Sequence, residues 1–291
     1  MSGRIQSVAQ ACGRKLTPLV LMVLIVVGCS APAASLPSAE AVDCTLRGPG
    51  VNLTGCDLRG ADLSGLNLTG AVLDGANLVG ANLSKAILSK SSFVDANLVG
   101  ANLESSTGES ADFESASLAN ASLVSGVFTS ANFALSDCSD ANMSGGTFTE
   151  ANFNNAALTW ASATATSFVG ATFNIANFEH AILKDADFSR ADVTRGTFTE
   201  ADVQGALFRE TNLRFASFGG VIAWGADFTQ ADMRDAYFSQ GVDAGKVGRK
   251  IIFRSADLRG ANLEFFAEFW FTDSRGAKLS GARMPDGTTH P

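Results

Sequence analysis

The sequence predicts an all-β solenoid built on a five-residue repeat, and two observations carry this prediction. A large apolar residue recurs at every fifth position from Leu53 to Phe238 without insertion or deletion, and only Gly108, Ala163 and Ala223 interrupt the series. This period matches neither the 3.6 residues of an amphipathic helix nor the two residues of a strand. Repeated units bury their apolar faces against their neighbours, so we expect one repeat domain over residues 43–240.

The other positions of the unit are also restricted. Ala stands two residues before most centres, as at Ala76 and Ala151, and Gly ends the early units, as at Gly55 and Gly80. A narrow solenoid has room for one large and one small inward side chain on each side, which explains the apolar pair. Gly at a corner suits a turn with positive φ. Because Gly is scarcer at corners after Gly80, we expect a different turn geometry in the later coils.

This pattern resembles the pentapeptide-repeat family, whose motif is a small residue, Asn or Asp, a central Leu or Phe, a polar residue and often Gly. The resemblance covers most of the chain after its first 42 residues. It implies a right-handed quadrilateral β-helix in which four units form a coil, with about nine to eleven coils stacked at the inter-strand spacing of ~4.8 Å. The family name implies no reaction, although some members resemble DNA and protect DNA gyrase.

Residues 1–28 predict an export signal. Three basic residues and no acidic one precede a mostly apolar stretch from Leu16 to Val27. That order is typical of a secretory signal, and the stretch is too short for a membrane-spanning helix. We therefore expect the chain to be exported.

The end of this segment, Val26-Val27-Gly28-Cys29, resembles the lipobox of bacterial lipoproteins. The resemblance implies that Cys29 is lipidated and anchors the protein to a membrane of the bacterial envelope. The alternative is an ordinary signal peptide cut near Ala31 or Ala34, with Cys29 incidental. Residues 29–42 have the small-residue, Pro-containing composition of a flexible tether.

Negative charge is concentrated in the middle of the chain. The net charge is −8, and removal of residues 1–28 would make it −11. A general nucleic-acid-binding face needs clustered positive charge, so no nucleic-acid partner is expected. No Lys or Arg occurs between Ser91 and Leu183, where the acidic residues are Asp95, Glu104, Glu109, Asp112, Glu114, Asp137, Asp140, Glu150 and Glu179.

The repeat changes near its C-terminal end. Residues 241–250 break the motif, and Phe253 resumes it, so we expect the break to replace two units and project as a basic loop. That loop is either simply solvated or a site for an anionic partner. Residues 251–291 contain final repeats and an aromatic block, which we expect to cap the last coil or, alternatively, to form a homodimer interface. The block comprises Phe265, Phe266, Phe269, Trp270 and Phe271.

The remaining polar and sulfur groups offer no catalytic arrangement. Cys44 and Cys56 lie at the start of the first coil, where an exported protein could carry a disulfide or two free thiols. Cys138 occupies a repeat centre and is expected in the core. His180 is expected on the surface, and neither it nor His290 has Cys or His at metal-ligand spacing. We expect no catalytic residue, metal or cofactor.

Several apolar residues fall at positions that should face solvent. With coils of twenty residues, Leu135, Ile175 and Phe215 share one corner at alternate coils, and Trp160 and Trp224 are also at outward positions. These five residues form either an interaction surface or the scatter of surface apolar residues that is common in proteins.

The expected function is that of a non-enzymatic, lipid-anchored envelope protein whose rigid β-helix is a scaffold for an unidentified protein partner. An acidic DNA mimic of the gyrase-protecting type is the alternative, but gyrase is cytoplasmic and this chain is expected to be exported. A secreted, non-lipidated interaction protein is the third possibility.

Overall fold

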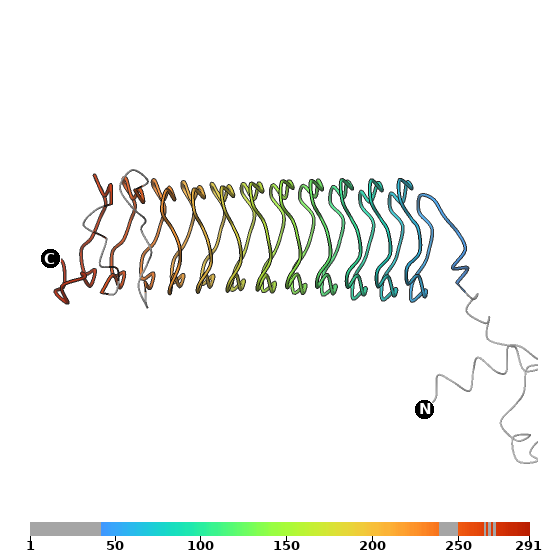
Figure 1. The fold of residues 1–291 in the computed structure, drawn as a ribbon, viewed down its shortest axis with the longest axis horizontal. Coiled ribbons are helices and arrows are strands. Elements are labelled where there is room, and N and C mark those ends of the chain that lie inside the picture. Colours follow the sequence, from blue (N-terminus) through green and yellow to red (C-terminus); the bar gives the residue numbers. More distant parts are fainter. Residues whose placement is uncertain (1–41, 239–249, 265, 267–268, 270–271) are drawn as a thin grey trace, which may run out of the picture. The chain divides into compact units, whose positions relative to one another are not determined.

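The computed structural model describes residues 42–238, 250–264, 266, 269 and 272–291 (Figure 1). The chain divides into two units, Met1–Ala41 and Val42–Pro291, and every described residue belongs to the second. The expected signal at residues 1–28, Cys29 and all of the expected tether except Val42 lie outside the described residues. A search of the described part finds no helix that is long and apolar enough to cross a bilayer.

The second unit consists of stacked coils, which are twenty residues long as far as Tyr237 (Figure 1). Single-residue parallel bridges join each coil to the next, and successive bridges start at Asn52, Asp57, Asp62 and Asn67. Four bridges per coil define four sides, one for each five-residue unit. The bridging residues run from Asn52 to Tyr237 and again from Ile252 to Arg283, and no longer strand occurs among the described residues.

Backbone hydrogen bonds explain why the coils stack. Leu53 N donates to the carbonyl oxygen of Val72 at 2.7 Å, and Val72 N donates back to Val51 O at 2.9 Å. At the corners a hydrogen bond between residues three positions apart closes the turn, as from Cys56 N to Leu53 O at 3.0 Å. The same pattern repeats along the column, so the amides of inner coils are satisfied without long strands.

The core confirms the inward positions that the repeat predicted. The central Leu and Phe residues and most of the Ala residues two positions before them are buried. Phenylalanines of successive coils stack, with ring centroids 4.8 Å apart for Phe133 and Phe153 and 5.0 Å apart for Phe153 and Phe173. Gly108 interrupts the series for a steric reason, because a Cβ there would lie 2.6 Å from the Phe128 ring.

The corners contradict the expectation of a changed turn geometry. Gly55 and Gly80 have φ of 67° and 64°, and Lys85 and Ser125, at later corners without Gly, have φ of 59° and 54°. The turn is therefore the same in early and late coils. Stacking imposes it on residues that rarely adopt it, since each corner amide bonds to the next coil, as Lys85 N does to Glu104 O at 2.8 Å.

The register of the described coils on either side of residues 241–250 differs from the sequence prediction. Bridges across it advance by 25 residues, as from Asp227 to Ile252, instead of twenty. The described residues on either side are thus one coil plus five residues apart, so the break stands in place of one side and not of two units. Only Lys250 of the expected basic loop is described, and it is exposed.

The aromatic block differs from the expected cap in the two members that are described. Phe266 and Phe269 are buried and continue the core, with Phe266 stacked 5.5 Å from Phe238. Residues beyond them add further bridges, including Ile252 with Asp273 and Asn262 with Arg283. These two rings are therefore interior and are not available as a homodimer interface. Phe265, Trp270 and Phe271 lie outside the described residues.

A disulfide joins Cys44 to Cys56 at the start of the first coil. Its Cα atoms are 5.6 Å apart, and Cys56 is buried against the first layer of the core. The bond thus ties the segment before the repeat to the repeat itself.

Candidate interaction surface

Corner residues of successive coils form four edges along the column, and one of them carries exposed apolar side chains. We call this the Leu135 edge, and it comprises Asp95, Ser115, Leu135, Asn155, Ile175, Arg195, Phe215 and Asp235. Leu135, Ile175 and Phe215 are 56%, 55% and 45% exposed. The structure therefore places these three residues on one edge at alternate coils, with Asn155 and Arg195 between them.

The backbone at these apolar corners is unfavourable. Leu135, Ile175 and Phe215 have φ of 60°, 59° and 60°, in the left-handed region. That conformation costs an L-residue roughly 1–2 kcal/mol, and it is rarest for a β-branched residue such as Ile175. Because the side chains are exposed, burial does not offset this cost. Strain of this kind favours a functional reason for the residues that bear it.

Trp160 lies on the neighbouring edge, not on the Leu135 edge. Its indole stacks on the His180 ring at 4.0 Å with 12° between the planes, and it remains 57% exposed. His180 Nδ1 is 3.2 Å from Glu200 Oε2, so His180 joins this stack to an acidic residue. Trp224 is half-buried. The five predicted surface residues therefore do not form one continuous patch.

Two arginines converge on the exposed ring of Phe215. The guanidinium carbons of Arg195 and Arg214 lie 5.8 Å and 5.3 Å from its ring centroid, within the range of cation–π interactions. Neither arginine has an ion pair within the described part of the chain. Both guanidinium groups therefore lie at an exposed aromatic surface without a salt bridge to any described residue.

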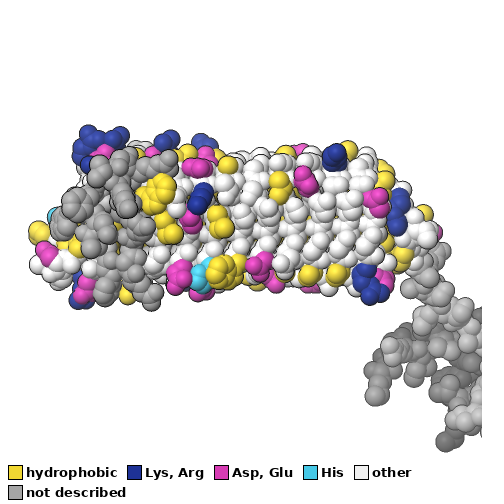
Figure 2. Space-filling view, viewed as in Figure 1, with side chains coloured by type: hydrophobic (Ala, Val, Ile, Leu, Met, Phe, Trp, Pro, Cys, Tyr) yellow, Lys and Arg dark blue, Asp and Glu magenta, His cyan; other side chains and the backbone are white. Residues whose placement is uncertain are grey.

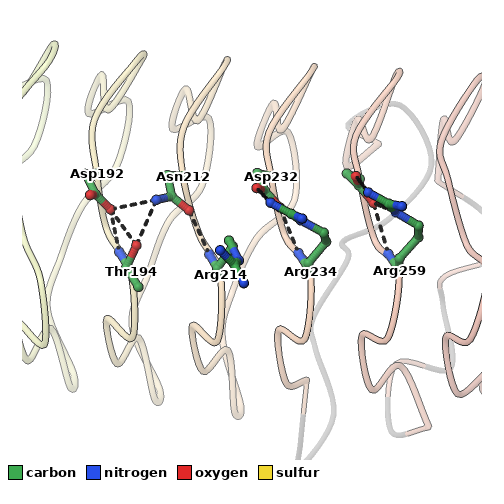
Figure 3. A network of polar contacts seen from close by, with 8 residues as sticks. Asp192, Thr194, Asn212, Arg214, Asp232, Arg234 and Arg259 are labelled. Carbon is green, nitrogen blue, oxygen red and sulfur yellow. Dashed lines mark hydrogen bonds and ion pairs between the residues drawn. The ribbon is translucent and has the colours of Figure 1, made fainter.

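Arg214 lies on the side of the column that ends at the Leu135 edge. A comparison of equivalent positions on that side explains why Arg214 has no ion pair among the described residues (Figure 3). In the next coils Asp232 accepts two hydrogen bonds from the side chain of Arg234, and Asp257 does the same for Arg259. The residue at the equivalent position before Arg214 is Asn212, an amide that offers no negative charge.

The Asn212 amide is also already engaged. Its nitrogen donates to Asp192 Oδ1 at 3.0 Å and to Thr194 Oγ1 at 2.8 Å, and its oxygen accepts the backbone N–H of Arg214. The buried Nε of Arg214 has no hydrogen-bond partner among the described residues. The Asn212 position therefore leaves the Arg214 guanidinium without an acceptor.

The same edge is acidic toward the N-terminus. Asp95 is exposed, and Glu114 lies on the adjoining side beside the corner residue Ser115. Asn132 donates to Glu114 at 3.2 Å, but no described cation pairs with either carboxylate. Figure 2 shows a face with no Lys or Arg over the middle of the column and basic side chains toward its ends. Along the Leu135 edge, Asp95 and the adjoining Glu114 precede the apolar corners Leu135 and Ile175, and Arg195 and the adjoining Arg214 follow them, before Asp235 at the far end.

Cys138 is the free cysteine among the described residues, and it lies in the core and not at this surface. The described residues contain no group of three or more His, Cys, Asp or Glu that could hold a metal ion. Cys138 is buried, and burial raises the pKa of its thiol to about 12, so the reactive thiolate is scarce at neutral pH.

The stacked coils define a repeat solenoid protein. The sequence matches Pentapeptide repeats in eight copies, over residues 52–89, 67–104, 111–149, 176–214 and 211–241, which together span more than half of its 291 residues. The chain therefore belongs to the pentapeptide-repeat family. No curated protein matches it.

Several solved structures resemble the chain in part. HetL, a pentapeptide repeat protein involved in heterocyst differentiation regulation in the cyanobacterium Nostoc sp. strain PCC 7120, is 25% identical, with 83% of this chain and 92% of HetL covered and a TM-score of 0.30. A trypsin-treated form of QnrB1, a plasmid-mediated fluoroquinolone resistance protein, is 18% identical over 66% of this chain and 88% of its own, with a TM-score of 0.29. A pentapeptide repeat protein from the Arabidopsis thaliana thylakoid lumen is 32% identical, with 36% and 66% covered and a TM-score of 0.18.

Sequence reasoning found the apolar corners but missed the charged residues beside them. Arg195, Arg214, Asp95 and Glu114 are not adjacent in the sequence, and the twenty-residue coil brings them to one edge. The sequence did contain a signal that Arg214 lacks a nearby acidic partner. Asp occurs two residues before Arg234 and Arg259, whereas Asn occurs two residues before Arg214.

Proposed function

We propose that this protein is a non-enzymatic, lipid-anchored scaffold of the bacterial envelope, whose β-helix holds an interaction surface in a fixed geometry. The observation that carries the proposal is the Leu135 edge, where exposed apolar residues occupy strained corners beside two arginines that have no ion pair among the described residues. A continuous column of buried Leu and Phe residues supports such a surface, because each coil is fixed by its neighbours.

The anchoring part of the proposal rests on Cys29 and the lipobox-like residues before it. We expect a bacterial host expressing the full chain to incorporate labelled palmitate, and the protein to fractionate with membranes. Cys29→Ser should abolish the label and release the protein from the membrane fraction, whereas Cys12→Ser should change neither. Equal labelling of wild type and Cys29→Ser would exclude lipidation at this cysteine and favour the secreted, non-lipidated alternative.

The scaffold part requires a protein partner at the Leu135 edge. Joint replacement of Leu135, Ile175 and Phe215 by Ser should abolish capture of crosslinked partner proteins from intact membranes. Replacement of Val127 and Ile182 by Ser is the matched control, because both are exposed but have no positive φ. This variant should leave capture unchanged. Unchanged capture by the triple variant would place the interaction elsewhere.

The acidic zone between Ser91 and Leu183 favours a second candidate, the DNA mimic of the gyrase-protecting type. A rod with that role must reach the cytoplasm, so finding the mature chain there would favour this candidate. Protection of gyrase by the purified protein, and its loss on replacing Glu104, Glu109 and Asp112 by Gln, Gln and Asn, would establish it.

A further inference from the structure

We propose that the Leu135 edge binds the same edge of a second, antiparallel copy of the chain, with Asn155 of both copies at the two-fold axis. This inference rests on the proposed function, because it names the partner of the proposed interaction surface. It requires no change in the described coils, since every residue that it uses is at a corner or next to one.

The regular coil sets the register of such a pair. Successive residues of the edge are twenty positions apart, so they are evenly spaced along the column. In an antiparallel two-fold pair, a residue a given number of coils before Asn155 meets the residue the same number of coils after it. Leu135 therefore meets Ile175 of the second copy, and both are among the most exposed large apolar residues described.

The charged residues meet opposite charges in the same register. The corner two coils before Asn155 is Ser115, and it meets Arg195 of the second copy, so Glu114 beside it lies near that arginine. The corner three coils before Asn155 is Asp95, and it meets Phe215 of the second copy with the adjoining Arg214. The two-fold axis is perpendicular to both columns. The side that carries Glu114 and Arg214 in one copy therefore lies next to the equivalent side of the second copy. Each pair occurs twice by symmetry, and none of these four side chains has an ion pair within its own described chain.

The other arrangements keep at most part of this complementarity. A parallel pair would place Asp95 against Asp95 and Arg195 against Arg195, which repel each other. An antiparallel pair centred half a coil beyond Asn155 would place Leu135 against Arg195 and Asp95 against Asp235. Centring it half a coil before Asn155 would place Glu114 opposite Ile175. Only the register centred on Asn155 matches the apolar pair and both charged pairs together.

Charge reversal with rescue tests the proposal. The full chain in detergent should be a dimer by sedimentation equilibrium. Arg195→Glu with Arg214→Glu, or Asp95→Arg with Glu114→Arg, should each weaken the dimer by about 100-fold. Mixing the two variants should restore it, because every reversed residue then meets an opposite charge. Lys85→Glu with Lys90→Glu makes the same change in net charge as the two arginine reversals, but on other edges, and should leave the dimer intact.

A cysteine at the axis tests the register. Asn155→Cys should form an intermolecular disulfide on mild oxidation, and Ser125→Cys, at an exposed corner of the opposite edge, should not. A monomer at all concentrations up to about 100 µM, failure of the mixed variants to re-form the dimer, or equal crosslinking at both positions would each overturn the proposal. A monomer that still captures a different protein through this edge would overturn the dimer while leaving the scaffold function intact.

Discussion

At the scale of the residue, the corner position is where this chain departs most from the ordinary backbone preferences of its amino acids. Positive φ recurs at Asp, Ser, Lys, Glu and even Trp and Ile residues, although Gly and Asn adopt it most readily. The backbone bonds of the next coil fix the turn, so the side chain is selected for other reasons. A large apolar residue at a corner is therefore stronger evidence for an interaction surface than one elsewhere on the surface.

Ile175 provides a direct test of this strain. Ile175→Asn should raise the free energy of unfolding by roughly 1 kcal/mol in dilute solution, because Asn tolerates the left-handed conformation better. Ile182→Asn is the control, since Ile182 is 43% exposed but has no positive φ. Chemical denaturation of both variants measures the effect, and equal destabilisation by both would contradict the cost assigned to this corner.

We predict that Asp273 makes the last coils sensitive to acid. Hydrogen bonds from the Arg275 and Arg254 side chains hold the pKa of its carboxyl below the usual range. A lowered pKa in the folded state stabilises the fold above the unfolded pKa, and that contribution is lost as pH falls through the folded value. Amide exchange at Phe253, which donates to Asp273 O, should therefore accelerate between about pH 5 and about pH 2 relative to exchange in the unfolded chain.

Asp273→Asn is the control for this effect. The variant should exchange faster than wild type at about pH 5, and the difference should shrink as the solution is acidified. A difference that stays constant over this range would mean that ionisation of Asp273 does not stabilise the last coils.

At the scale of the element, phenylalanine rings stack through the middle and later coils of the core. Phe198 is fully buried, and its ring stacks on Phe178 at 4.8 Å and on Phe218 at 4.9 Å. Phe198→Ala should destabilise the protein by about 3–5 kcal/mol, because it removes apolar contacts and leaves a cavity between coils. Thr197→Ala, on the outer face next to it, should cost less than about 1 kcal/mol by denaturant titration. Similar losses for both variants would contradict the inward assignment.

The disulfide should protect only the beginning of the column. Opening the Cys44–Cys56 loop removes a constraint worth about 3 kcal/mol in chain-entropy terms. Each coil contacts only its neighbours, so Cys44→Ser with Cys56→Ser should speed amide exchange at Leu53 and Leu58 and leave Phe153 unchanged. Uniform acceleration along the chain would instead show that the column unfolds as one unit.

The sequence predicts the elements well where a single local rule governs them. The five-residue period identifies the buried Leu and Phe positions and the shared corner of Leu135, Ile175 and Phe215. It does not reveal the common corner geometry, because Ser or Lys at a corner gives no local sign that the next coil fixes its φ. It also misjudges the break at 241–250, since only the stacking of Phe228 with Phe253 shows which side resumes.

Pairing of charges was the least predictable part of the surface. Asp232 and Asp257 bind the arginine two residues later, whereas Asp192 binds Thr194 and the Asn212 amide. Which acceptor a cation finds depends on contacts between coils. Arg214 is exceptional only when these coils are compared side by side (Figure 3).

At the scale of the whole molecule, the distribution of charge matters more than its total. The net charge of −8 comes largely from a zone without cations, followed by coils that contain most of the arginines. On the Leu135 edge this separation places acidic and basic groups on opposite sides of an apolar middle. In an antiparallel pair, the first described residue, Val42, of each copy would lie at opposite ends of the paired columns.

Photocrosslinking in living cells tests the central claim most directly. A photoreactive amino acid at position 135 of the full chain should yield covalent protein adducts, and mass spectrometry should identify a peptide containing Ile175 of a second copy. The same group at position 125, on the opposite edge, should yield none. Absence of any protein adduct at position 135, or equal adducts at both positions, would contradict an interaction surface at the Leu135 edge.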